Sequence, residues 1–509
     1  MNLFQVPPCA VARCLAAASL PLLLAACSVA RPPAAVDAPM PAQWQTPLPA
    51  GTQLPHAGAL PQLADWWRQS GDALLVELIA AAQAASPDLA SAAARIVEAR
   101  ATRVQAGAAL GPTLDGNLSL SRGNTLSTGS GGVSGGTASL PSFTNAQAGL
   151  QAGWELDLFG GLAATRDAAG ARLSSSQAQW HQARVAVAAE TANAYFAERA
   201  CAHQLQVSAS DAASRRETAR LTELSAKAGF AAPADAALAR ASAADASARL
   251  TQQRTQCALQ RQALVALTGW ELPALAQRLD AQAAGVDLPA LRAVDSVPAR
   301  ALAQRPDVYA AELAVAAASF DAGAAQAQRY PRLSLSGSIA ALHVRGGGAS
   351  ETLNSWSIGP LQLSLPIFDG GTRAANAEAA RARYDEAAAQ YRAKVRQAVR
   401  EVEEALLRLQ DTAQRAADAD SAVTGYQASL DATQARYDGG LASLFDLEDA
   451  RRTLFAAQTA RVALQRERTE AWVALYRALG GGWARPDEGQ ALAMPSPSSA
   501  PPASEAKAR

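Results

Sequence analysis

Two segments of the chain alternate apolar and polar residues with a period of two, the pattern of a β-strand with one apolar face. Each is followed by a polar segment rich in Gly and Ser and then by a second strand-like segment, at residues 147–159 and 354–368. Strands of about ten to fifteen residues are long enough to cross a bilayer when tilted. The alternating positions are Leu114, Gly116, Leu118 and Leu120 in the first half and Leu333, Leu335, Gly337 and Ile339 in the second.

After Gly161 and Gly371 the period becomes helical, and long helices are predicted at about 163–228 and 372–438. A helix of about 66 residues would be roughly 100 Å long. The second one has an apolar seam with the spacing of a coiled coil. Its members are Tyr384, Tyr391, Val395, Ala398, Val402, Ala405 and Leu409.

Shorter helices are predicted before the strands and after the long helices. Pro87 and Pro306 occupy first-turn positions that tolerate proline, and Pro112 and Pro331 end these helices. Return helices are predicted at about 233–269 and 443–480. The combined length of a short and a return helix is close to that of the long helix beside them, so we expect them to stack end to end and form two helical columns per half.

The same order of elements, with the same spacing between the two prolines of each half, indicates an internal duplication. One chain then supplies four strands. Four strands cannot close a barrel, and open sheet edges are costly in a membrane because their backbone groups find no water. Three copies would form a 12-stranded barrel that continues into a tunnel of 12 helical columns. The predicted fold class is therefore mainly α with a membrane β-barrel, built from a duplicated helix-strand-strand-helix-helix unit.

The predicted organisation has five parts. They are a lipoprotein signal peptide (1–26), an N-terminal lipidated segment (27–74), repeat 1 (75–280), repeat 2 (295–483) and a disordered C-terminal tail (484–509) rich in Pro, Ser and Ala.

The N-terminus has the features of a bacterial lipoprotein signal. An apolar stretch of about twelve residues, too short to span a bilayer, ends in Leu-Ala-Ala before Cys27, the predicted lipidation site. Ser28 follows where a retention signal would have Asp, which favours the outer membrane. An ordinary signal cleaved nearby is the alternative. No later segment reaches 18 consecutive apolar residues, so no transmembrane helix is expected.

Composition excludes several functions. The 45 basic residues balance the 45 acidic ones, which removes the basic surface of a nucleic-acid binder. The four histidines are scattered without metal-ligand spacing, so no metal site, no cofactor beyond the lipid and no enzyme activity are expected. The Gly-rich run at 129–136 lacks the following Lys of a phosphate loop.

Cys201 and Cys257 lie 28 residues on either side of Gly229, the predicted turn between a long helix and its return helix. Antiparallel helices would place them at the same height, and the periplasm is oxidising, so a disulfide is predicted. The alternative is two buried small apolar residues.

Several motifs resemble the outer-membrane factor family of TolC and OprM type, in its NodT-like lipoprotein branch. They include Arg305-Pro306-Asp307, Leu365-Pro366-Ile367-Phe368-Asp369-Gly370-Gly371 and Ala435-Arg436-Tyr437 followed by Leu447-Glu448-Asp449-Ala450-Arg451. The resemblance covers nearly the whole mature chain. It implies a homotrimeric channel anchored in outer-membrane lipid, the passive exit duct of a tripartite efflux pump. Its partners would be a periplasmic adaptor (membrane fusion) protein and an inner-membrane transporter, such as one of the RND type.

The resemblance also implies a gate at the periplasmic tip, where Gly229, Gly439 and Gly440 form the hairpin turns. Family members close the aperture with an apolar constriction and a ring of aspartates, and the matching positions here are Phe445, Asp446 and Asp449. This chain has Phe445 where leucine is commoner. The alternative is that both aspartates are solvated surface acids, with Arg451 and Arg452 pairing locally.

Two other functions remain open at this stage: a periplasmic adaptor lipoprotein and a structural coiled-coil protein of the envelope. An adaptor should have one helical hairpin flanked by compact β domains, and two hairpins with long paired strands disfavour it. The sequence does not identify a transported substrate, because a duct accepts whatever its transporter selects.

Overall fold

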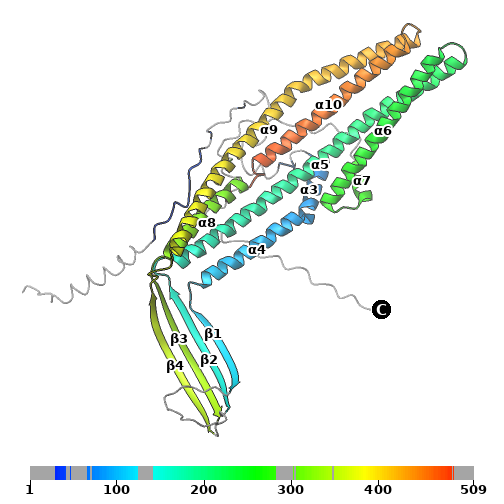
Figure 1. Cartoon of the computed structure of the whole chain (residues 1–509). Helices are drawn as coiled ribbons and strands as arrows, with labels where there is room; N and C mark the ends of the chain where they lie inside the picture. Colours follow the sequence, from blue (N-terminus) through cyan, green and yellow to red (C-terminus); the bar gives the residue numbers. More distant parts are fainter. Residues whose placement is uncertain are drawn as a thin grey trace, which may run out of the picture. The chain divides into compact units, whose positions relative to one another are not determined.

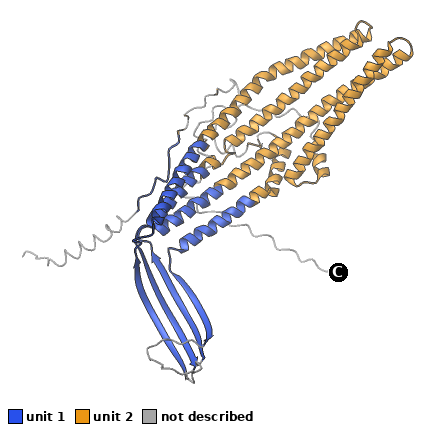
Figure 2. Ribbon diagram, in the orientation of Figure 1, with its two compact units in different colours: residues 1–38, 91–177, 310–393 blue, residues 39–90, 178–309, 394–509 orange. Residues whose placement is uncertain are grey.

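The computed structural model describes residues 29–39, 41, 46, 66–68, 71–123, 142–281, 302, 305–346, 349–483 and 485. The predicted signal peptide, Cys27 and all of the predicted tail except Arg485 lie outside these residues. The chain divides into two compact units, coloured in Figure 2. The first unit combines residues 1–38, 91–177 and 310–393, and the second combines residues 39–90, 178–309 and 394–509.

The first unit contains one antiparallel sheet of four strands in the order β1-β2-β3-β4 (Figure 1). The strands are β1 (Thr113–Gly123), β2 (Phe143–Leu156), β3 (Arg332–Gly346) and β4 (Ala349–Ser364). The central pair, β2 and β3, joins strands from different halves of the chain. β1 and β4 therefore form the two edges of the sheet.

The second strand of each half begins and ends earlier than its pattern predicts. β2 ends at Leu156 because the next residue, Asp157, turns to cap the following helix. β4 ends at Ser364, two residues before Pro366, which has no N–H to donate to a ladder. The apolar motifs after both strands thus belong to the connections.

The two faces of the sheet differ in polarity. The strand register places Leu118, Leu150, Ile339 and Trp356 on one face with further Leu and Ala residues, and most of these side chains are exposed. The opposite face has mostly Ser, Asn, Gln and Gly; Ser338 and Ser357, for example, lie 2.9 Å apart there, Oγ to Oγ. The alternation predicted from the sequence therefore gives one apolar and one polar face.

Each long helix begins at an aspartate that follows a strand. The helices are α5 (Gly161–Lys227) and α9 (Thr372–Asp438). Asp157 accepts hydrogen bonds from Leu162 N and Ala163 N at 3.1 and 2.7 Å. Asp369 does the same for Gly371 N and Arg373 N at 3.0 and 3.1 Å. Carboxylates at these positions satisfy N–H groups that have no partner inside the helix.

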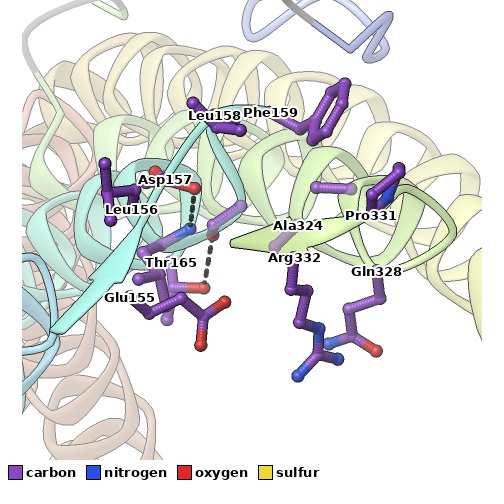
Figure 3. Close-up of a pocket in the computed structure, with 13 residues that line it drawn as sticks. Glu155, Leu156, Asp157, Leu158, Phe159, Thr165, Ala324, Gln328, Pro331 and Arg332 are labelled. Carbon is purple, nitrogen blue, oxygen red and sulfur yellow. Dashed lines mark hydrogen bonds between the residues drawn. The ribbon is translucent and has the colours of Figure 1, made fainter. Parts of the chain in front are cut away.

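A cavity of about 140 Å³ lies beside the first of these caps, between the end of β2 and the end of helix α8 (Pro306–Ala327). Glu155 and Arg332 are among its lining residues, and Figure 3 shows that the Asp157 carboxylate points toward the start of α5. Both oxygens of that carboxylate already accept hydrogen bonds from the start of α5. We therefore regard the cavity as part of the strand-to-helix junction and assign no ligand to it.

Two helices were not expected from the pattern, α3 (Ala73–Ala85) and α7 (Leu272–Ala281). The other helices are α4 (Pro87–Ala108), α6 (Pro233–Thr268) and α10 (Leu444–Ala478). In the second unit the end of α6 meets the end of α3, where a Cβ on Gly269 would lie 3.8 Å from Ala85. The predicted end-to-end stacking concerns α4 and α6, which this contact does not join, so the stacking stays a prediction.

The apolar seam of α9 is buried from Tyr384 to Ala405, as predicted. Its last predicted member, Leu409, is only half-buried, and Leu406 is buried as well.

An aromatic cluster supports α10 in the second unit. Trp66 stacks on Trp472 with ring centroids 4.9 Å apart, and Trp67 lies 4.5 Å from Tyr476.

The Arg305-Pro306-Asp307 motif forms a buried ionic cluster at the start of α8. Arg305 donates two hydrogen bonds to Asp307 at 2.9 and 2.8 Å and one to the Ala478 carbonyl, at the end of α10, at 3.0 Å. Burial alone would raise the pKa of Asp307, but the hydrogen bonds and charge of Arg305, with the charge of Lys394, hold it below its ordinary value. A helix C-terminus favours a cation, so the motif joins two helix ends.

Among the described helices, α8 is long and apolar enough to qualify as a membrane span by length and composition. The bent pair α3 and α4 would also qualify if counted as one span. Core helices meet the same criterion, and α8 buries Val308, Val315, Ala317 and Ala322.

Candidate gate at the helical hairpins

Two glycines turn the long helices back on themselves. Gly229 and Gly440 have φ angles of 81° and 71°, which glycine adopts without steric cost. The next residues, Phe230 and Leu441, donate backbone hydrogen bonds to carbonyls five residues earlier, at 2.9 and 2.7 Å. Gly439 lies in the second turn but does not have a positive φ, so Gly440 alone supplies the left-handed conformation there.

Asp446 takes part in a capping box at the start of α10. Its N–H donates to the Ser443 hydroxyl at 3.2 Å, and its carboxylate accepts from the Ser443 N–H at 2.9 Å and from the hydroxyl at 2.6 Å. These hydrogen bonds, with the hydroxyl contributing most, hold the pKa of Asp446 below its ordinary value. The carboxylate therefore stabilises the helix start as well as adding negative charge near the turn.

Phe445 and Asp449, the other two predicted gate residues, are exposed in the single chain. Phe445 retains 68% of its accessible surface, so its ring packs against little within its own chain. Asp449 pairs with Arg452 one turn further along α10, and both side chains are more than half exposed. The predicted local pairing of Arg452 is thus present, while the gate role of the three residues stays a prediction.

A buried ionic network at the same level of α10 joins the two hairpins. Glu448 on α10 accepts from Arg215 on α5, from the Ser242 hydroxyl on α6 at 2.5 Å and from Arg451 at 3.1 Å. The side chains of Arg215, Glu448 and Arg451 are only 8, 13 and 6% exposed. Charges buried this deeply are stable only when they are paired and hydrogen-bonded.

Further contacts extend the connection between the hairpins. Arg215 also pairs with Asp211 at 2.8 Å, and Arg451 donates to the Thr218 hydroxyl at 2.7 Å and to the side chain of Gln434 at 2.9 Å. Arg451 therefore contacts α5 and α9 simultaneously.

An apolar cluster surrounds the network. It contains Ala219, Ala239, Leu444 and Leu447, and half-buried Tyr437 packs against it. The Tyr437 hydroxyl lies 3.3 Å from that of Thr222. The first hairpin contributes only small residues, so the second can approach it closely.

A disulfide joins the two helices of the first hairpin. Cys201 on α5 and Cys257 on α6 are bonded, with their Cα atoms 5.5 Å apart. Both residues are buried. The equal distance from Gly229 places them opposite each other, as the antiparallel arrangement requires.

The sequence reasoning missed Arg215 and gave Glu448 no role. Arg215 lies in a long polar stretch of α5, and its partner is 233 residues away in the sequence. One signal was present: Glu448 and Arg451 occur inside the motif that carries the family resemblance. Among the described residues, no group of three or more His, Cys, Asp or Glu side chains is arranged to hold a metal ion.

A fold of long helical hairpins and a four-stranded antiparallel sheet is similar to that of solved outer-membrane channels. The structure of the outer-membrane channel OprN aligns with a TM-score of 0.75 and 27% identity, covering 89% of this chain and 99% of that one. A model of the outer membrane efflux protein family matches residues 78–270 and 297–481, inside the two predicted repeats. The chain belongs to this family.

Similar proteins of assigned function come from Pseudomonas putida. The chain is 32% identical over 475 residues to the pyoverdine export outer membrane protein OpmQ, covering 92% of this chain and 97% of OpmQ. It is 31% identical over 483 residues to the toluene efflux pump outer membrane protein TtgI, covering 91% of this chain and 97% of TtgI. The predicted resemblance and the outer-membrane efflux assignment are thereby confirmed.

Proposed function

We propose that the protein is the homotrimeric exit duct of a tripartite efflux pump. The observation that carries this proposal is the four-stranded sheet with an exposed apolar face and two free edges. Its strands are 11 to 16 residues long, and about 9 to 11 residues suffice for a tilted strand to cross a bilayer. An apolar face of this size is suited to lipid, and the polar face to a water-filled lumen.

The two edges require partners. In a bilayer the outward N–H and C=O groups of β1 and β4 would have no water to bind. If β4 of one copy pairs with β1 of the next, three copies close a barrel of twelve strands. The helices of the same three copies then enclose a tunnel whose tip is formed by the hairpins.

The expected partners are a periplasmic adaptor and an inner-membrane transporter, such as one of the RND type. In a pump of this kind the inner-membrane transporter supplies the energy, and the duct is passive. OpmQ is named for pyoverdine and TtgI for toluene, which differ greatly in size and polarity. Such different cargoes support a duct that leaves substrate choice to the transporter, so we assign no substrate.

The hairpin contacts support a gate at the tunnel tip. In the closed trimer the exposed Phe445 rings form an apolar plug and Asp449, with Asp446, a ring of negative charge. The Glu448 network holds the second hairpin against the first. Opening then requires Arg215 and Glu448 to separate, which an adaptor that binds the tip can drive.

The N-terminal arm supports lipidation of Cys27. In the first unit the Arg31 guanidinium lies 4.1 Å from the centre of the Phe320 ring, and the Ser319 hydroxyl donates to the Pro32 carbonyl. Cys27 precedes Arg31 by four residues in the sequence, and four residues span at most about 14 Å. Phe320 is two turns from the end of α8, which leads into β3. A lipid on Cys27 would therefore be held near the end of the sheet that adjoins the helices.

Reconstitution tests the proposal. The full-length protein, extracted from outer-membrane fractions, should migrate as a heat-modifiable trimer and produce single-channel conductance in planar bilayers. A monomer without conductance would contradict the proposal and favour an adaptor or a structural coiled-coil protein. Mass spectrometry of the N-terminal peptide checks the lipid on Cys27 independently.

A further inference from the structure

Two arginines lie on the apolar face of the sheet, each one residue before the end of its strand, β1 or β3. Figure 1 shows that these strands end on the side of the sheet away from the helices. Arg122 on β1 and Arg345 on β3 are both opposite Thr144 on the intervening strand. Their side chains are therefore on the same face, and their Cα atoms are about 10 Å apart, two strand spacings. Both arginines are exposed.

Hydrogen bonds confirm which side chains at this end of the sheet share the apolar face. The His343 ring is 2.9 Å from the Thr352 hydroxyl and 3.2 Å from the Ser350 hydroxyl, so all three side chains share a face. Ser350 is opposite Arg345 in the register. Arg345 thus extends from the same face as these groups, beyond the last apolar positions.

No carboxylate of the described residues neutralises this face at that height. Glu351, the acid at this end of β4, is opposite Val344 and hence on the polar face. The chain between β1 and β2 adds none, since residues 124–141 contain no charged amino acid. Neither arginine forms an ion pair with another described residue.

The length of the sheet between the Trp154 end and the arginine end matches the thickness of the apolar part of a bilayer. Leu335, next to Trp154 in the register, is ten residues before Arg345 on β3. Ten residues span about 33 Å along a strand, or roughly 24 Å along the membrane normal at the usual barrel tilt, close to the ~25 Å apolar band of outer-membrane barrels. Trp154 then lies at one interface, and the two arginines lie at the opposite, outer one.

We propose that Arg122 and Arg345 bind the phosphate groups of a phosphorylated glycolipid, lipid A, in the outer leaflet. This inference rests on the proposed insertion of the sheet. Two guanidinium groups on the lipid-facing surface at headgroup height lack protein carboxylates, and phosphate is their best available partner because it accepts paired N–H donors. The His343, Thr352 and Ser350 side chains supply further polar groups beside them.

The test measures lipid A binding to the detergent-solubilised full-length protein by native mass spectrometry. The unaltered protein should bind lipid A with both phosphates about tenfold or more tightly than dephosphorylated lipid A, because charge-assisted contacts are lost with the phosphates. The double variant Arg122→Gln/Arg345→Gln should lose this preference. Arg122→Lys/Arg345→Lys should retain part of it.

Two matched controls separate position from charge. Glu351→Gln changes a charge at the same height on the polar face, and Arg332→Gln removes an arginine from the opposite end of β3. Both should preserve the preference for phosphorylated lipid. An equal preference in the double glutamine variant, or none in the unaltered protein, would overturn the inference.

Other outcomes are distinguishable. If the double glutamine variant loses its trimer in lipid-free detergent, the arginines join neighbouring copies, which also overturns the inference. Conductance in planar bilayers of phospholipid alone tests the channel itself. A conducting protein that does not prefer phosphorylated lipid refutes only the lipid site, whereas absence of conductance refutes the proposed function.

Discussion

The two helical hairpins are nearly equal in length but are fixed in different ways. α5 and α9 each have 67 residues, and α6 and α10 have 36 and 35. The first hairpin has a disulfide far from its turn, while the start of α6 at Ala232 has no side-chain cap. In the second, a capping box fixes the turn, and the half-exposed pair Arg415–Glu467 connects the helices farther away.

If the tip opens as proposed, this difference indicates which hairpin moves. A covalent bond keeps α5 and α6 together, whereas exposed ion pairs such as Arg415–Glu467 contribute little. The second hairpin is held against the first mainly where Glu448 meets Arg215. We therefore expect the first hairpin to act as the fixed wall and the second as the moving element.

The largest expected effect comes from Glu448→Ala, which leaves Arg215 and Arg451 without their shared carboxylate. Removing one partner of a buried ion pair costs about 3–5 kcal/mol. Denaturant unfolding followed by circular dichroism should show this loss, and resting single-channel conductance should rise. Glu217→Gln is the matched control, because it breaks an exposed pair with Arg220 on α5, close in sequence to Arg215 in the first hairpin. Unchanged conductance in Glu448→Ala would refute the proposed role of the network.

The double variant Cys201→Ser/Cys257→Ser should destabilise the first hairpin by about 2–4 kcal/mol, because the reduced chain regains entropy on unfolding. Reductant added to the unaltered protein should lower its stability equally, and should not affect the double variant. Labelling of both cysteines by a maleimide in the native, non-reduced protein would show that no disulfide forms.

The starts of α4 and α8 give a second comparison between the halves. Asp307 is buried beside Arg305, whereas Asp88, at the equivalent position, is exposed. The pKa of Asp307 is below its ordinary value of 3.8, so its stabilising effect is present above that pH and is lost as the pH falls through the folded-state pKa. Asp307→Asn should flatten the acid limb of a stability–pH curve, and Asp88→Asn should leave it unchanged. Equal curves for the two variants would contradict this.

The smallest effects concern the helix starts after the two turns. Ser443→Ala should destabilise the second hairpin by about 1 kcal/mol, because the capping box loses its hydroxyl. Ala232→Ser should stabilise the first by up to about 1 kcal/mol, since it adds the missing cap. Thermal unfolding of the two variants measured together should show shifts of opposite sign. Shifts of the same sign would mean that these residues act through other contacts.

Much of the fold was predictable because its signals are local. Pro87 and Pro306 mark the first turns of helices, Gly229 and Gly440 mark the reversals, and alternation identifies the strands. The predicted disulfide followed from equal spacing about a turn. The strand ends were less predictable, because Leu158 and Phe159 continue the apolar character of β2 into its connection.

The proposed gate was predictable only in part. The family resemblance gave Phe445, Asp446 and Asp449, and the turn after Gly440 explains why these residues lie near the tip. The capping role of Asp446 has a local signature, Ser443 three residues earlier. The role of Glu448 depends on Arg215, and no periodicity along α10 indicates which helix lies opposite.

The sequence by itself determined the duplication, the order of the long helices and strands, and the positions of the turns, since each depends on residues close together in the chain. Only the tertiary structure decided that β2 pairs with β3 from the other half, which side chains share a face with Arg122, and that Glu448 meets Arg215. These contacts join residues far apart in sequence, and packing selects among many pairings that local patterns allow.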